Sequence, residues 1–394
     1  MTIETSVVRR INFIRASAIE AFQPAIIGSS LIYLEGGITP QEVGFLKTMF
    51  LLTTVAFDVP TSAVAKIIGS EAAFFTGKII HILALVLFAF CLHYGINLFY
   101  LVEFLFGAGS AFILGLRSTI ACEVESDAKK RVDLVSNVQT AFYIFTSCSF
   151  LFFLARDENG SIEANGLIII TLFSSMVSGY LIMKNHKTKF NSDHDSKHLL
   201  NQFASIKIQL LRLFSSSNSH AKVSLTNYVL LAALFIGIQE VLPPFAKTRS
   251  FDFGISTLFL AFGVFASALG AAASRIVFTK NIRNEKIFLF LAVIICVAFI
   301  VENQMLFYSG MILIAFTKGL LQVRLFGIAA SAVGGLSSNP LFHSFCNLSS
   351  TIIAAIVLTI AAGLNYSIYL IPAIFSIILV TCFYLSKSEG ASDV

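Results

Sequence analysis

The chain of 394 residues has no tryptophan, and charged residues make up 12% of it, compared with about 25% in typical soluble domains. The charged surface that keeps a globular domain in solution is therefore missing. Proline is also scarce, with seven residues, so little stops an apolar run from continuing as a helix. Apolar side chains are abundant instead, because hydrophobic residues make up 56% of the sequence.

Two further absences narrow the class of protein. No Gly-x-x-x-x-Gly-Lys-Ser/Thr loop occurs, so we expect no ATP-driven step and no cofactor. The cysteines are scattered through apolar segments without metal-ligand spacing, so we expect free thiols and no metal site. They are Cys91, Cys122, Cys148, Cys296, Cys346 and Cys382. No small-residue cleavage site precedes the first apolar stretch, so we expect no cleaved signal peptide. We also expect no enzyme, because no stretch is left for a soluble catalytic domain.

About a dozen apolar stretches have the roughly 20-residue length that crosses a bilayer. They are continuous and do not alternate in ten-residue segments, which favours helices over a membrane barrel. The predicted spans are about 11–34, 41–63, 72–93, 96–120, 132–155, 163–184, 223–246, 254–278, 286–302, 305–328, 340–363 and 366–386. The sequence therefore predicts an all-α membrane protein with twelve transmembrane helices in two six-helix halves.

A polar stretch near the middle divides the chain. We predict an N-terminal half over residues 1–190, a cytoplasmic linker over 191–221 and a C-terminal half over 222–394. Apolar residues within the linker recur at helical spacing between lysines and arginines, which favours a helix lying on the membrane surface. A solvated linker is the alternative.

The basic residues between the spans predict the orientation. With the N-terminus inside, nearly all of them fall on the cytoplasmic side, and only Arg156, Lys247 and Arg249 fall outside. Cytoplasmic loops retain positive charge, so we expect both termini in the cytoplasm and the chain in the inner, or plasma, membrane. The net charge of +5 is thus accounted for by the cytoplasmic placement of the basic residues. We therefore expect no nucleic-acid partner.

Acidic residues inside the spans are candidates for proton coupling, because burial disfavours the charged carboxylate. Glu20 lies near the middle of the first span, and Gln23 three positions later should share its helical face. Glu103 lies in the fourth span. The alternative for each acid is a structural pair with a nearby base.

A third candidate acid, Glu240, lies in the seventh span beside Gln239. Pro243 and Pro244 follow, and their missing amide donors should break or bend the helix. Such interruptions often lie beside the site or gate of a carrier. Exposure at the outer interface is the alternative reading for Glu240.

Basic residues within the spans outnumber the acidic ones, which favours a substrate with a carboxylate or phosphate. Arg15, Arg117 and Arg324 lie where they can reach the inner interface, so the lysines are more informative. The candidate substrate-binding residues are Gln23, Lys47, Lys78, Gln139, Gln239 and Lys318.

Three stretches carry the pattern of a known family. Residues 33–46 resemble a second helix that starts with Gly-Leu-Ser-x-x-Gln-Ile-Gly, and residues 57–62 resemble its Phe-Glu-Ile-Pro-Thr-Gly end. Residues 106–115 are similar to the fourth helix of the same group, a branch of the major facilitator superfamily (MFS). The resemblance covers essentially the whole chain and implies the MFS fold.

The resemblance also implies a charged gate, and here the chain departs from the family. The loop after the second helix normally carries an Asp followed by basic residues, whereas this chain has Lys66 and Glu71 at the aligned positions. A swapped ion pair is one interpretation, and loss of the latch is the other. Asp58 matches the family's Glu, and Arg117 and Arg324 occupy matching positions of the two halves, so these five residues are the gating candidates.

Taken with the intramembrane charges, the resemblance implies a monomeric secondary transporter that works by alternating access. We expect proton-coupled efflux of an amphipathic anionic or zwitterionic organic molecule, such as a drug or a peptide-like or siderophore-like metabolite. The fifth span lacks the Gly-Pro motif of drug/proton antiporters. The alternatives are uptake of a similar substrate by proton symport, and a transport-inactive membrane receptor or assembly partner.

Overall fold

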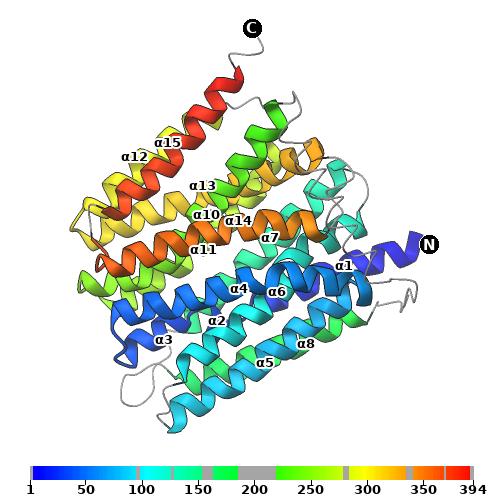
Figure 1. The fold of residues 1–394 in the computed structure, drawn as a ribbon, viewed down its shortest axis with the longest axis horizontal. Helices are drawn as coiled ribbons and strands as arrows, with labels where there is room; N and C mark the ends of the chain where they lie inside the picture. The colour runs from blue at the N-terminus through cyan, green and yellow to red at the C-terminus, as the bar shows by residue number, and fades with distance from the viewer. Residues whose placement is uncertain are drawn as a thin grey trace.

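The computed structural model describes residues 3–94, 98–125, 128–152, 163–184, 219–277, 284–333, 340–367 and 370–390. Within these ranges all regular structure is helical, and the long helices run side by side in one bundle (Figure 1). Of the predicted linker, residues 191–218 lie outside the described ranges.

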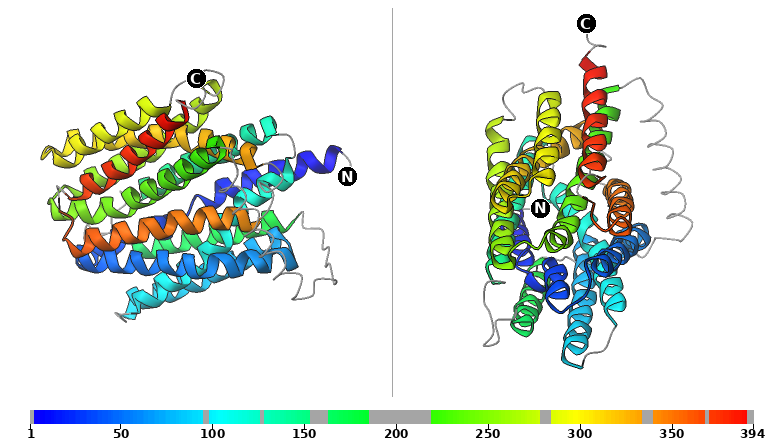
Figure 2. Two further views of the ribbon diagram at one scale, coloured as in Figure 1. Left: turned by 45° about the horizontal axis from the view of Figure 1, so that its top comes forward. Right: turned by 90° about the vertical axis from the view of Figure 1, so that its left-hand side faces the viewer.

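The N-terminal half contains α1 (Ile3–Glu20), α2 (Pro24–Ile27), α3 (Ser29–Glu35), α4 (Pro40–Ile68), α5 (Ser70–Tyr94), α6 (Phe99–Val124), α7 (Ala128–Leu151) and α8 (Ala164–Met183). The C-terminal half contains α10 (Ser219–Thr248), α11 (Phe253–Val277), α12 (Asn284–Ile300), α13 (Gln304–Val333), α14 (Pro340–Gly363) and α15 (Leu370–Gly390). With α1, α2 and α3 counted as one broken span, each half crosses the bundle six times, as the sequence predicts. Figure 2 (right) shows the two halves as separate groups of helices.

An even number of crossings brings both ends of the chain to one end of the bundle, which we call the terminal end (Figure 1). The opposite end, which carries the turn between α3 and α4, is called the distal end. Under the predicted orientation the terminal end is cytoplasmic.

Most of the described helices are apolar enough to lie in a membrane. Six contain a full apolar stretch of spanning length, within α5, α8, α10, α11, α13 and α14. Parts of α6, α12 and α15 form shorter apolar helices. The remaining long helices, α1, α4 and α7, carry charged residues in their sequences. Large apolar side chains such as Phe173 (70% exposed) and Ile377 (66% exposed) cover the outer faces, as contact with lipid requires.

The first span is not the single helix predicted over residues 11–34. Helix α1 ends at Glu20, and α2 starts at Pro24 after Gln23 takes φ −124° and ψ 65°. A residue before proline avoids the helical region, and proline lacks the amide donor that would continue the ladder. The expectation that Glu20 and Gln23 share a helical face is therefore wrong.

The opposite happens in α10, where a break or a bend is predicted and the helix is not broken. Pro243 and Pro244 lie inside a helix that continues to Thr248. They fall in the last turns of the helix, so few backbone hydrogen bonds remain to be disrupted after them. The predicted start of α4 has a clear cause, because Thr39 and Glu42 form a capping box and Pro40 occupies the first turn.

The halves meet along two antiparallel helix pairs, α4 with α14 and α7 with α11. Across α7 and α11, Ser136 Oγ donates to the Ala271 carbonyl (2.9 Å) and Ser147 Oγ donates to the Ala261 carbonyl (2.8 Å). Leu51 of α4 lies in the apolar core of the C-terminal half. The interface between the halves is thus packed and hydrogen-bonded over much of its length.

Within the C-terminal half, α11 and α13 touch backbone to backbone. A Cβ atom on Gly270 would overlap the Phe316 carbonyl oxygen, and one on Gly319 would overlap that of Ser267. Two helices can approach this closely only where small residues face each other.

We predict that Gly270→Ala forces α11 and α13 apart and lowers the free energy of unfolding by about 1–3 kcal/mol. Gly263→Ala on the same helix is the control, because the nearest atom to its Cβ, that of Ala315, lies 3.9 Å away. Thermal unfolding of the detergent-solubilised variants measures both. Equal effects of the two substitutions would contradict the close contact.

Candidate functional site

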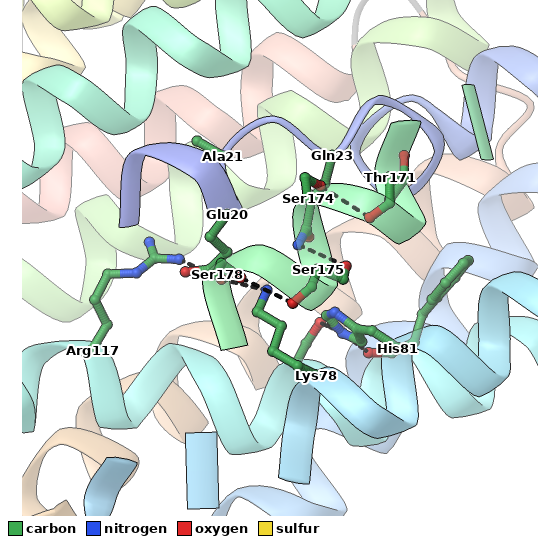
Figure 3. A network of polar contacts seen from close by, with 12 residues as sticks. Glu20, Ala21, Gln23, Lys78, His81, Arg117, Thr171, Ser174, Ser175 and Ser178 are labelled. Carbon is green, nitrogen blue, oxygen red and sulfur yellow. Dashed lines mark hydrogen bonds and ion pairs between the residues drawn. The ribbon is translucent and has the colours of Figure 1, made fainter. Parts of the chain in front are cut away.

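A buried ion cluster lies inside the N-terminal half (Figure 3). Glu20 Oε1, at the end of α1, accepts a hydrogen bond from Arg117 Nη2 of α6 at 2.8 Å. Lys78 Nζ of α5 lies 3.3 Å from the same oxygen. Glu20 is 5% exposed and Lys78 1%, so both are removed from water. A charge in such a place needs a compensating partner, and one carboxylate here serves two cations.

Hydroxyl groups of α8 hold the broken part of the first span beside this cluster. The Ala25 amide donates to Thr171 Oγ1 (3.0 Å), and Gln23 Nε2 donates to Ser175 Oγ (3.2 Å). The break at residues 21–23 leaves backbone groups without helical partners, and Thr171 supplies one for the Ala25 amide, whereas Ser175 holds the Gln23 side chain. Neither α8 residue was predicted from the sequence, although their spacing of four places both on one helical face.

His81 shares a face of α5 with Lys78 and contacts α6. Its Nε2 lies 3.2 Å from the Phe106 carbonyl oxygen and 3.2 Å from Ser110 Oγ. These contacts join two packed helices of one half.

A second buried pair joins α3, α4 and α6. Lys47 Nζ lies 2.9 Å from Glu103 Oε1, and the Tyr33 hydroxyl donates to the same oxygen at 2.9 Å. Lys47 also donates to Ser29 Oγ. Glu103 is fully buried. Lys47 and Lys78, predicted to meet an acidic substrate, thus each lie beside an acid of the protein itself.

Lys318 of α13 has a different environment. Its Nζ lies 5.6 Å from the centre of the Tyr143 ring and 5.8 Å from that of Phe235. Among the described residues, no carboxylate lies within ion-pair distance of this nitrogen. Glu240 of α10 is half-buried and interacts at longer range with Lys47, Glu103 and Lys318.

Lys318 lines a cavity of about 160 Å³ between the halves, which we call the central cavity. Its walls come from α7 of the N-terminal half and from α10, α11 and α13 of the C-terminal half. Six of the 18 lining residues are aromatic, Phe142 and Phe259 among them, most of the others are aliphatic, and Gln239 adds an amide. A concave, mostly apolar site with few polar groups is the usual form of a small-molecule site.

One contact links the ion cluster to the central cavity. The Arg117 guanidinium carbon lies 4.4 Å from the centre of the Phe142 ring, a distance typical of a cation–π contact. Phe142 is part of the cavity wall. Gln139, one turn away on α7, is half-buried and does not line the cavity.

The gating candidates are placed only in part. Asp58 is fully buried and its Oδ2 accepts a hydrogen bond from Asn347 Nδ2 of α14 at 3.2 Å, across the interface of the halves. Glu71 is buried in the first turn of α5. The side chains of Lys66 and Arg324 lie outside the described part of the structure. The swapped latch therefore stays a prediction.

A family model for the Major Facilitator Superfamily matches residues 13–363. The chain belongs to the Major Facilitator Superfamily. Membership makes it a multi-pass membrane protein and a secondary transporter of small solutes, not an enzyme.

Solved structures agree on the fold. A variant of the E. coli fucose:proton symporter FucP matches with a TM-score of 0.63 at 12% identity, over 98% of both chains. FucP in the outward conformation matches with a TM-score of 0.66 at 13% identity, again over 98% of both chains. At this identity the likeness supports the fold alone. A search among curated proteins gave no match.

We predict that Glu20→Gln destabilises the protein by about 3–5 kcal/mol, because it leaves Lys78 and Arg117 buried without a counter-charge. Adding Lys78→Met removes one of these cations and should recover part of the loss. Glu42→Gln, at an exposed acid of α4, is the control and should cost far less. Thermal unfolding in detergent measures all three variants, and a double mutant less stable than Glu20→Gln would contradict the pairing.

Proposed function

We propose that this transporter carries an amphipathic organic molecule with a carboxylate or similar acidic group, bound in the central cavity with its acid at Lys318. The observation that carries the proposal is the position of Lys318. It is a cation in a largely apolar cavity, and its ammonium group faces aromatic rings.

An ammonium group in such a place loses much of its hydration, and aromatic faces replace only part of it. A solute carboxylate would add a charge-assisted hydrogen bond. The apolar body of the solute would lie against rings such as Phe142 and Phe259. Lys47 and Lys78 are poorer candidates, because Glu103 and Glu20 already supply this compensation.

Glu240 is the acid best placed to couple this binding to protons. Its ionised carboxylate attracts Lys318 and repels an acidic solute, whereas its protonated form does neither. A proton on Glu240 and an acidic solute at Lys318 therefore favour each other's binding. Glu20 and Glu103 each have cations at contact distance, which stabilise their negative charge.

This sign of coupling supports symport over the efflux expected from the sequence. Proton-driven export by exchange requires the proton and the solute to compete, so that one leaves when the other binds. Here the two bind together and would cross together. With the inward proton gradient of a plasma membrane, we propose uptake as the direction.

We predict that Lys318→Gln weakens binding of an acidic solute by about 1–3 kcal/mol and leaves a neutral analogue nearly unchanged. Pairs of amphipathic carboxylic acids and their carboxamides, titrated onto the reconstituted protein, provide the comparison. Lys318→Arg should retain part of the preference for the acid, and Lys184→Gln at the terminal end is the control. Equal losses for acid and amide would remove Lys318 from recognition of the charge.

We predict that Glu240→Gln abolishes accumulation of the acidic solute driven by a proton gradient but retains exchange of labelled for unlabelled solute. Proteoliposomes acidic outside measure symport, and proteoliposomes acidic inside measure exchange for protons. Glu302→Gln at an exposed distal position is the control. Full gradient-driven uptake by Glu240→Gln would exclude Glu240. If the unmodified protein accumulates the acid only when the interior is acidic, the efflux interpretation holds instead of symport. If it moves none of the tested acids, the transport-inactive receptor is favoured.

A further inference from the structure

A second, smaller cavity of about 50 Å³ lies toward the distal end, and we call it the vestibule. Leu31 and Leu34 of α3 form one wall, and Lys247 of α10 is part of the other. Three residues, Leu242, Leu260 and Tyr308, line both the vestibule and the central cavity. The two cavities thus follow one another, with these three side chains between them.

The three shared residues belong to α10, α11 and α13 of the C-terminal half. Leu242 is 6% exposed and Tyr308 1%, and Leu260 is half-buried, so all three are packed to some extent where the two cavities adjoin. The Tyr308 ring stacks on Phe259 with centroids 5.2 Å apart. We call Leu242, Leu260 and Tyr308 the constriction. It is built by the C-terminal half alone, whose internal packing holds it together.

The facing wall of the vestibule belongs to the other half. Helix α3 is tied to the N-terminal half by the hydrogen bonds from Tyr33 to Glu103 and from Lys47 to Ser29. When the two halves rock, Leu31 and Leu34 move with the N-terminal half, and the constriction moves with the other. Rocking would widen the vestibule first and uncover the constriction from the distal side.

The charges of the two cavities match. Each is lined by a single lysine, Lys247 in the vestibule and Lys318 in the central cavity, and no acidic residue is among the residues that line either one. Lys247 is exposed and hydrated, so it would bind an anion more weakly than the half-buried Lys318.

We propose that the vestibule is a second, weaker site for the transported acid, and that Leu242, Leu260 and Tyr308 form the gate between it and the central cavity. The class of solute rests on the proposed function. The gate and the selection of anions at Lys247 do not, because both are properties of the empty protein and are measured without transport.

Two serines of α11 offer a matched pair of probes. Ser256 lines the vestibule and Ser267 lines the central cavity. Each is changed separately to cysteine and treated in intact cells with membrane-impermeant methanethiosulfonates, one bearing a sulfonate and one bearing a trimethylammonium. The chain with its own cysteines gives the background rate. A C-terminal tag that reacts only after lysis establishes that the distal face is outside, and inverted vesicles replace cells in the opposite case.

We expect the ratio of the sulfonate rate to the cationic rate at Ser256→Cys to exceed the ratio that a small free thiol gives in solution. Lys247→Gln should slow the sulfonate reagent and speed the cationic one, each by roughly fivefold as for two unit charges about 4 Å apart in water, so their ratio should fall by about 25-fold. Arg249→Gln is the control. It removes the same charge at a residue two positions further on, and Arg249 does not line the vestibule. No reaction at Ser256→Cys, or a ratio equally changed by both substitutions, would overturn the vestibule site.

For the gate, we expect Ser267→Cys to react slowly from the distal face and several-fold faster when Leu260→Ala is added. Leu269→Ala is the control, because it makes the same change on α11 at an exposed residue that lines neither cavity. Identical rates with Leu260→Ala and Leu269→Ala would overturn the gate. If labelling behaves as expected while acidic solutes fail to bind at Lys318, the route stands and the proposed solute class fails.

Discussion

The high cost of an unpaired charge in a membrane interior governs how this chain is arranged. In the N-terminal half, Glu20 is shared by Lys78 and Arg117, and Glu103 is shared by Lys47 and Tyr33. These contacts join α1, α3, α4, α5 and α6, so the same interactions that compensate the charges also fix the helices. Lys318 has no such partner at ion-pair distance among the described residues, which leaves its charge available to a solute.

The two halves use different means to hold together. Buried ion pairs recur in the N-terminal half, whereas the described core of the C-terminal half is built from a large apolar cluster and the close contact of α11 with α13. Removing one partner of a buried ion pair leaves an uncompensated charge, while truncating an apolar residue leaves a cavity. A half stabilised by ion pairs therefore depends on each of a few residues, and an apolar half distributes its stability over many.

The fold could be predicted from the sequence because apolar runs of spanning length are local signals. The twelve crossings and the two halves follow from them, and the family match agrees with the predicted resemblance. The break before Pro24 was also visible in principle, but the continuous apolar run masked it. The pairing of Lys47 with Glu103, 56 positions apart, could not be read, because nothing local indicates which helices become neighbours. The sequence therefore identified the charged residues and not their partners.

The serine contacts between α7 and α11 have a mechanical consequence. Ser136 and Ser147 donate to carbonyl groups of the opposite helix. Thr48 of α4 shows the other option, because its hydroxyl lies 2.9 Å from the Gly44 carbonyl oxygen on its own helix and 3.4 Å from Thr359 Oγ1 of α14. A hydroxyl that can rotate between two acceptors keeps a hydrogen bond while the helices slide past each other. No donor has to be stripped of its partner midway through the movement. The interface between the halves can thus shift in small steps without losing hydrogen bonds, which an interface of ion pairs would not permit.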